Sequence, residues 1–189
     1  MKILTIGDSH SISGWMSINL PNVEITNIYV GPKLMYTFNK DGLGINSNTI
    51  SSYDVVVFCF GEIDVRCHTH TFGILAIDEL VYNYLERIKE CTKGSDVKKV
   101  VYFIPPPAKK INTPDDVGFP FLGTDEERLQ YCLYMNKKLL QGCIKYNYSF
   151  IDLYDDYCDV DGFLRRDMSD GHVHIKDTVP LIRFIQNKL

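Results

Sequence analysis

The chain has 189 residues, of which 45% are apolar and 23% are charged, as is usual for a soluble globular protein. This length favours one domain with a substantial core, so we expect residues 1–189 to form a single domain. The net charge of −4 comes without the basic clusters that bind nucleic acid or anionic membranes. No apolar run approaches the roughly 20 residues of a membrane span. We therefore expect neither nucleic acid nor a membrane as partner.

The cysteines and the N-terminus both favour a reducing compartment. None of the six cysteines has a CxxC spacing, and most occupy apolar positions, where a thiol serves as a small buried side chain. No apolar leader with a small-residue cleavage site follows Met1. We therefore expect free thiols and a cytoplasmic protein.

In chain order, short apolar runs alternate with amphipathic segments. The first strand is expected at residues 2–6, followed by a short helix at 11–18 and a second strand at 23–30. Residues 33–52 give no clear prediction. A continuous apolar run at 55–60 is typical of a central parallel strand.

The second half of the chain continues the alternation. Apolar residues recur at helical spacing from 77 to 91, and a strand is expected at 99–104. A proline-containing loop of roughly 17 residues then leads to Thr124, which begins a capping box and a long helix. The last strand is expected at 148–153 and the last helix at 179–189. The whole pattern predicts an α/β fold in which helices cover both faces of a parallel sheet of about five strands.

All five histidines lie in three short segments, at residues 7–10, 61–70 and 170–174. The first two segments follow predicted strands, and ligands of parallel α/β sheets bind beyond the carboxyl ends of the strands. Ser9 stands at the end of the first strand, while the third segment supplies an acid and histidines. This is the outline of a nucleophilic serine site assembled from both ends of the chain.

The positions of these polar segments carry a resemblance. The sequence Gly7-Asp8-Ser9 follows the first strand, Gly31 follows the second, Gly61-Glu62-Ile63-Asp64 follows the third, and Asp170 to His174 precedes the last helix. In this order the chain resembles the SGNH hydrolases, also called GDSL-like esterases and lipases, over nearly its whole length. The resemblance implies a flavodoxin-like three-layer α/β/α fold. It also implies hydrolysis of esters of lipids, sugars or other small molecules, or acyl transfer, without a cofactor.

By this resemblance Ser9 is the nucleophile, His174 the base and Asp170 the acid that orients the base. The backbone N–H groups of Ser9 and Gly31 are the implied oxyanion donors. Two plainer interpretations stay open, in which Ser9 only caps a helix and Gly31 is an ordinary turn glycine before Pro32.

The third segment departs from the family pattern, because Ile63 stands where the family has asparagine. Loss of one oxyanion donor can lower the rate by about 10²–10³-fold. Arg66 or His68 lies close enough in sequence to replace it, and Arg66 also suits an anionic or sugar substrate. Gly61, Asp64, Arg66 and His68 are therefore candidate oxyanion or substrate-binding residues. The alternative for Arg66 is a salt bridge to Glu62 or Asp64.

The fourth segment also departs from the pattern, because the spacing from Asp170 to His174 is one residue longer than in the family and that to His172 is one shorter. We favour His174 as base because it stands directly before the last helix. If the segment is extended, both imidazoles point to the same side, so His172 stays an alternative base. A rival interpretation is a metal site formed by His68, His70, Asp170, His172 and His174.

The sequence therefore predicts a serine esterase that acts on a small acyl ester, with an acetyl group on a sugar hydroxyl as the favoured substrate and no metal. An acyltransferase that passes the same acyl group to a sugar or other alcohol is the nearest alternative. Ile63 and the unusual spacing also leave open a non-catalytic protein that binds a glycan or another ligand.

Overall fold

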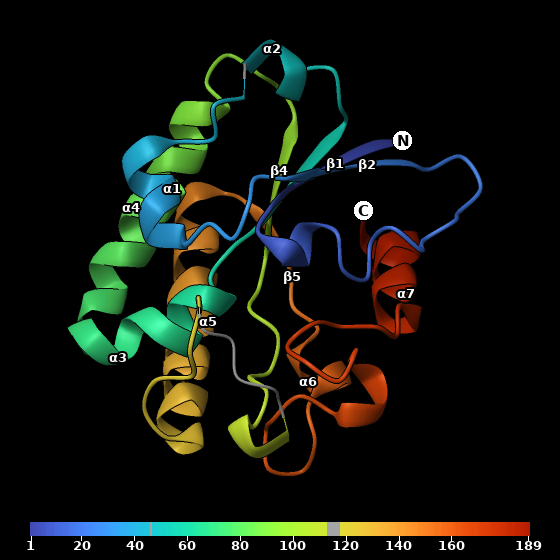
Figure 1. Cartoon of the computed structure of the whole chain (residues 1–189). Coiled ribbons are helices and arrows are strands. Elements are labelled where there is room, and N and C mark those ends of the chain that lie inside the picture. The colour runs from blue at the N-terminus through green and yellow to red at the C-terminus, as the bar shows by residue number, and fades with distance from the viewer. Residues whose placement is uncertain (46, 113–117) are drawn as a thin grey trace.

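The computed structural model describes residues 1–45, 47–112 and 118–189 (Figure 1). The strands form one parallel five-stranded sheet in the order β2-β1-β3-β4-β5, which is the flavodoxin-like order. They are β1 (Lys2–Gly7), β2 (Glu24–Tyr29), β3 (Val55–Cys59), β4 (Lys98–Tyr102) and β5 (Ser149–Ile151). The predicted fold class is confirmed, and each strand lies within two residues or so of its predicted bounds.

Helices cover both faces of the sheet. Helices α1, α4 and α5 lie on one face and α7 on the other (Figure 1). The helices are α1 (Met35–Asp41), α2 (Ser47–Ile50), α3 (Thr69–Phe72), α4 (Ala76–Cys91), α5 (Asp125–Tyr146), α6 (Tyr154–Tyr157) and α7 (Val179–Lys188). Short turns of 3₁₀ or π geometry are η1 (Ser9–Ser11), η2 (Asp64–His68), η3 (Lys110–Asn112) and η4 (Arg166–Met168). None of the described helices is both long and apolar enough to cross a membrane.

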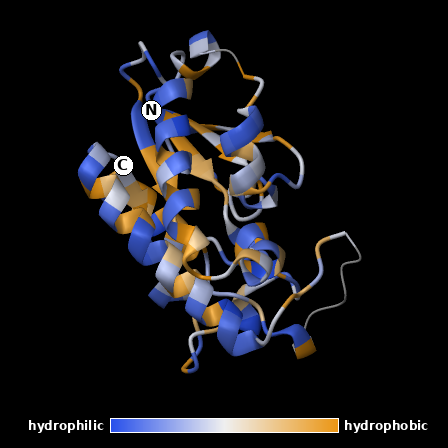
Figure 2. Cartoon of the chain, turned by 90° about the vertical axis from the view of Figure 1, so that its left-hand side faces the viewer, coloured by the Kyte–Doolittle hydropathy of each residue, from blue (hydrophilic) through white to orange (hydrophobic). Residues whose placement is uncertain are grey.

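The central strands are apolar on both sides because each side faces a separate core. Along β3, Val56 and Phe58 pack toward α1, α4 and α5, while Val55 and Val57 pack toward the α7 side. This alternation follows from the two-residue period of a strand. Figure 2 shows the apolar strands enclosed by helices whose outer surfaces are largely hydrophilic.

The structure differs from the sequence-based expectation between β1 and β2 and adds helices between β2 and β3. The helix expected at 11–18 is wrong, because only the turn η1 and further turns occupy this region. Gly14 there has a φ of 80°, which a right-handed helix does not contain. Residues 33–52, which gave no clear prediction, hold α1 and α2. In the predicted long loop, residues 113–117, including Pro114, lie outside the described residues.

The long helix α5 starts as predicted and is fastened to the end of β4. Thr124 and Glu127 form the capping box, with Glu127 N–H donating to Thr124 Oγ1 at 3.1 Å. Further along α5, the buried Asn136 side chain accepts the Ile104 N–H at 2.9 Å and donates to the Ile104 carbonyl at 2.8 Å. One side chain thus satisfies both backbone groups of a residue that has just left the sheet.

Replacing Asn136 with alanine should therefore lower the free energy of unfolding by about 2–4 kcal/mol, because two buried backbone groups lose their partner. Urea unfolding of the variant and of wild type measures this difference. Asn187→Ala on α7, where the amide is exposed and bonds only within its own helix, is the matched control. A loss no greater than that of the control would contradict the assigned role of Asn136.

Candidate active site

The close approach of β1 and β3 places Ser9 at the carboxyl edge of the sheet. A Cβ atom on Gly7 would lie 1.9 Å from the Cys59 carbonyl oxygen, so only glycine fits here. The next residue, Asp8, donates its N–H to the same oxygen at 3.1 Å. Its carboxylate then accepts the His10 N–H at 2.8 Å and caps η1. The chain therefore turns sharply directly after the strand, with Ser9 at the turn.

A second loop, at residues 170–174, comes from the other end of the chain. Ser169 and Ile175 form an antiparallel bridge, and Asp170 N–H donates to the His174 carbonyl at 3.0 Å. The loop therefore returns on itself, which brings the Asp170 side chain back to His174. The segment is bent over residues 171–174, so the extended conformation that would bring both imidazoles to one side is not formed, and the His172 residue is exposed.

The two loops meet in a chain of hydrogen bonds. The His174 Nδ1 atom lies 2.8 Å from Asp170 Oδ2, and its Nε2 atom lies 2.8 Å from Ser9 Oγ. Burial alone would raise the pKa of Asp170, but hydrogen bonds from the His174 ring and from the N–H groups of His172 and His174 outweigh it and lower this pKa. An ionised Asp170 accepts a hydrogen bond from the Nδ1–H group of His174, which leaves the Nε2 lone pair for the Ser9 hydroxyl.

Two backbone N–H groups, one shortly after β1 and one shortly after β2, are candidate donors to a ligand. Within the described residues, neither the Ser9 N–H nor the Gly31 N–H has a hydrogen-bond acceptor. Gly31 has a φ of 87°, and a Cβ atom there would meet nothing within 4 Å, so the space beside it is open. These are the two backbone donors that the sequence assigned to an oxyanion.

Gly61 and Asp64 have structural roles in place of the predicted substrate contacts. A Cβ atom on Gly61 would lie 2.8 Å from the Ile104 side chain and 3.1 Å from that of Met35, so this glycine allows close packing. The Asp64 carboxylate is fully buried and accepts the N–H groups of Met35 at 2.6 Å and Tyr36 at 3.3 Å. It thereby caps α1 from a distant part of the chain.

Burial raises the pKa of Asp64 to about 7, although the hydrogen bonds from Met35 and Tyr36 lower it. Between pH 4 and pH 7, approximately, the folded chain thus holds a proton that the unfolded chain has released. Stability should therefore fall as the pH rises through this range. Asp64→Asn keeps an oxygen for the Met35 N–H but does not titrate, so thermal unfolding of this variant should show a shallower pH dependence. Equal slopes in both proteins would refute the shift.

Arg66 forms the salt bridge that was its alternative role. Its guanidinium donates to both carboxylate oxygens of Glu62, at 2.8 and 3.2 Å, and to the Phe119 carbonyl, and it lies over the Phe121 ring. Both members of the ion pair are buried, with Arg66 only 6% exposed. Ile63 is buried as well. The predicted replacement of the missing asparagine by Arg66 is thus not the arrangement seen.

Truncating Arg66 alone should therefore destabilise the fold by about 3–5 kcal/mol, because Glu62 is left buried without its cation. The double variant Glu62→Gln, Arg66→Met removes both charges and should regain most of that loss. Chemical unfolding of the two variants provides the comparison. If Arg66→Ala instead unfolds like wild type but fails to hydrolyse an acyl ester that wild type hydrolyses, the predicted oxyanion role of Arg66 would be supported.

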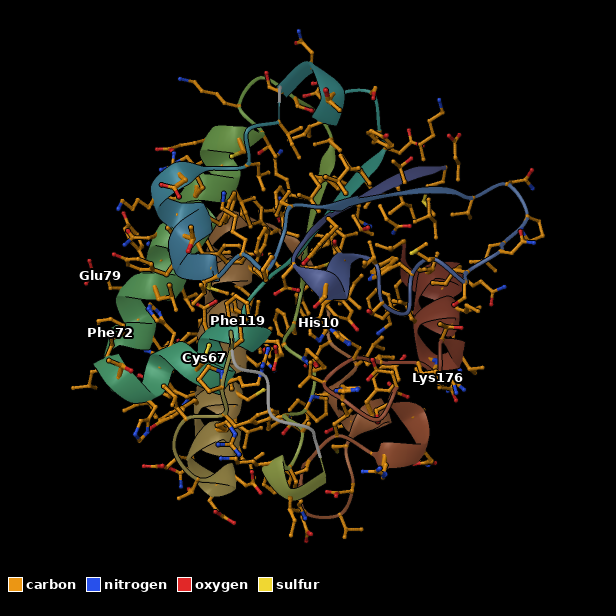
Figure 3. The ribbon with its side chains drawn as sticks, viewed as in Figure 1. His10, Cys67, Phe72, Glu79, Phe119 and Lys176 are labelled. Carbon is orange, nitrogen blue, oxygen red and sulfur yellow. The ribbon has the colours of Figure 1, made fainter. Side chains whose placement is uncertain are left out.

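His68 and His70 lie apart from each other and from His174. The His68 ring packs between Tyr36 and Phe72, with centroids 5.3 and 4.6 Å away, and burial lowers its pKa. It lines a cavity of about 460 Å³ among α1, α3 and α4, on the side of the molecule where Figure 3 labels Phe72. His70 lies 3.7 Å from Glu127. In the described part of the chain, no group of three or more His, Cys, Asp and Glu side chains is arranged to hold a metal ion.

His10 is the site residue to which the sequence assigned no role. Its ring is buried near the middle of the molecule (Figure 3), with its centroid 5.2 Å from that of His174. Its Nδ1 atom lies 3.1 Å from Asp8 Oδ1 and its Nε2 atom 3.2 Å from the Val173 carbonyl oxygen. The only sequence signal for it is its place directly after Ser9.

No family model and no curated protein matches this sequence. Among solved structures, a GDSL-like lipase from Bacteroides thetaiotaomicron superposes with a TM-score of 0.64 at 14% identity, over 98% of this chain and 85% of the other. The chain has the fold of the SGNH hydrolases.

Two further structures with this fold extend the comparison. A lipase/acylhydrolase from Enterococcus faecalis matches with a TM-score of 0.61 at 18% identity, over 100% of this chain and 96% of the other. An acetyl xylan esterase matches with a TM-score of 0.61 at 17% identity, over 100% and 97%. The SGNH hydrolase fold is thus shared from end to end, while the sequences have diverged widely.

Proposed function

We propose that this protein is a serine esterase that removes a small acyl group from an alcohol through an acyl-Ser9 intermediate. The observation that carries the proposal is the hydrogen-bond chain from Ser9 Oγ through His174 to Asp170, with both links at 2.8 Å. A serine hydroxyl becomes a nucleophile when a neighbouring base takes its proton, and a third group orients that base. The fold and its hydrolase neighbours support the same proposal.

In the first half of the reaction, Ser9 Oγ attacks the acyl carbonyl carbon while His174 Nε2 takes the hydroxyl proton. The carbonyl π electrons move onto oxygen and form a tetrahedral oxyanion. The unpaired N–H groups of Ser9 and Gly31 donate to this oxyanion. The intermediate then collapses, the bond to the alcohol oxygen breaks, and that oxygen takes the proton from His174.

In the second half, water replaces the alcohol. His174 takes a proton from this water as its oxygen attacks the acyl carbon, and a second tetrahedral oxyanion forms. When the bond to Ser9 Oγ breaks, His174 returns the proton to the serine and the free acid leaves. Asp170 stays ionised throughout and stabilises the imidazolium that forms twice in each cycle.

We expect the acyl group to be short. The small recess next to Asp8, His10 and Glu62, with a volume of about 10 Å³, has room for one water and is lined by none of the three triad residues, so it does not define the acyl site. The likeness to an acetyl xylan esterase adds support for an acetyl ester on a sugar as the substrate class. Acetylated oligosaccharides are therefore the substrates to test first, beside p-nitrophenyl acetate as a general acyl donor.

Ser9→Ala should lower kcat for p-nitrophenyl acetate by about 10³-fold or more, as loss of a triad member does. His174→Ala should be similarly impaired, whereas His172→Ala, its exposed neighbour, should keep most of the activity. Steady-state kinetics of the purified variants, with circular dichroism to verify folding, test these expectations. Wild-type turnover in Ser9→Ala would show that Ser9 is not the nucleophile. An inactive His172→Ala beside an active His174→Ala would show that His172, and not His174, is the base.

The same assay separates the other activities considered for the chain. Activity that a chelator abolishes and zinc restores would replace the serine mechanism by a metal-dependent one. Transfer of the acetyl group to an added sugar in preference to water would identify an acyltransferase. A wild-type protein that binds acetylated oligosaccharides without turnover would be a binding protein that has kept the fold.

A further inference from the structure

The buried His10 ring lies between two groups that accept hydrogen bonds. On one side the Val173 carbonyl oxygen is 3.2 Å from Nε2, and a carbonyl can only accept. On the other side Asp8 Oδ1 is 3.1 Å from Nδ1, and this oxygen already accepts the His10 backbone N–H at 2.8 Å. Satisfying both contacts requires one proton on Nε2 and a second proton between Nδ1 and Asp8. A neutral histidine beside an ionised aspartate carries only one of these two protons.

The surrounding charges favour that additional proton. Burial, the largest single influence, lowers the pKa of His10, but the hydrogen bond and charge of Asp8, the charge of Glu62 and the Val173 carbonyl together outweigh it, so this pKa is raised. Cys59 and Tyr102, which line the same small recess, have pKa values that burial raises well above their ordinary range, so they stay neutral there. The His174 ring is a further titratable neighbour, with its centroid 5.2 Å from that of His10.

The contact with Val173 joins the two halves of the candidate site. Val173 stands in the loop between Asp170 and His174, and its side chain is buried at 8% exposure. His10 directly follows Ser9 in the turn that Asp8 caps. The buried imidazole therefore connects the turn that holds Ser9 to the loop that holds the other two members of the hydrogen-bond chain.

We propose that protonated His10 is a positioning residue, which holds the 170–174 loop against the Ser9 turn and releases it when the ring loses its additional proton. The proposal rests on the serine esterase function given above. Loss of the proton leaves one ring nitrogen facing an acceptor with no hydrogen between them, so one of the two contacts must break. A misplacement of about 1 Å in the parts of an active site can lower the rate by about 10²-fold.

Two substitutions separate the charge from the contact. His10→Gln keeps an amide donor near the position of Nε2 but does not titrate, so it should stay active and lack the fall in kcat that we expect of wild type as His10 loses its proton. His10→Phe fills the space without a donor and should lower kcat for p-nitrophenyl acetate about 10–100-fold at pH 7, with a smaller change in KM. His172→Gln, an exposed histidine in the same loop, is the matched control and should follow the wild-type pH profile. A wild-type kcat and pH profile in His10→Phe would overturn the proposal.

Nitrogen NMR of the imidazole rings in the wild-type protein measures the protonation of His10 directly. This measurement does not require activity, and it does not require that His10→Phe folds. The His10 signals, assigned by their loss in His10→Gln, should show both ring nitrogens protonated at pH 7 and a transition above the ordinary histidine range. A neutral His10 at pH 7 would refute the proposal. If wild type and Ser9→Ala are equally inactive, the esterase function fails while the NMR result still decides the state of His10. If wild type is a Ser9-dependent esterase and His10→Phe matches it, only the positioning role fails.

Discussion

The contact between the end of β1 and the end of β3 is the constraint on which the candidate site depends. Because Gly7 has no Cβ atom, the backbone of the two strands can approach until Asp8 N–H reaches the Cys59 carbonyl. This contact turns the chain away from the sheet directly after the strand. This change of direction lets the Asp8 carboxylate cap η1. It also gives the neighbouring residues Ser9 and His10 different surroundings. Ser9 faces His174, while His10 is buried against the loop that carries it.

The carboxyl edge of the sheet also buries three acidic side chains, and each is stabilised by a different kind of partner. Asp8 is held by the His10 ring and backbone, Glu62 by the guanidinium of Arg66, and Asp64 by the N–H groups at the start of α1. A buried carboxylate without such a partner would be strongly destabilising. The third segment therefore supports the site by holding α1 and the neighbouring loop in place. Ile63 in this segment is buried and Arg66 is paired with Glu62, so backbone N–H groups are the oxyanion donors in our mechanism.

Elements that are determined by nearby residues could be predicted from the sequence, whereas elements held in place by distant residues could not. The strands, α4, α5 and α7 show in the apolar periodicity, and the Thr124 capping box lies within four consecutive residues. Helix α1 was not predictable, because its cap is the side chain of Asp64, far along the chain, and its own N-cap residue Leu34 offers no side-chain hydrogen bond. The helix expected at 11–18 is interrupted at Gly14, whose φ of 80° lies outside the right-handed helical region.

The same distinction applies within the site. Ser9, Asp170 and His174 were found because their residue types and positions match a reaction, and the structure brings them together. The guanidinium N–H groups of Arg66 could donate either to Glu62, one helical turn away, or into the space beside Ser9. The sequence is compatible with both roles. His10 gave no signal because its partner is the backbone carbonyl of a residue near the other end of the chain.

The unusual spacing of the acid and the base is explained by the same backbone carbonyl. With four residues from Asp170 to His174, the loop closes through the Asp170 N–H bond to the His174 carbonyl and through the bridge flanking it, and Gly171 adopts a φ of 88° to make the turn. Closure in this form turns the Val173 carbonyl inward, where an unpaired buried oxygen would be unfavourable. His10 supplies the donor that this carbonyl needs. The longer loop and the histidine after the serine are thus two parts of one arrangement, in which the additional residue creates an acceptor and the buried imidazole satisfies it.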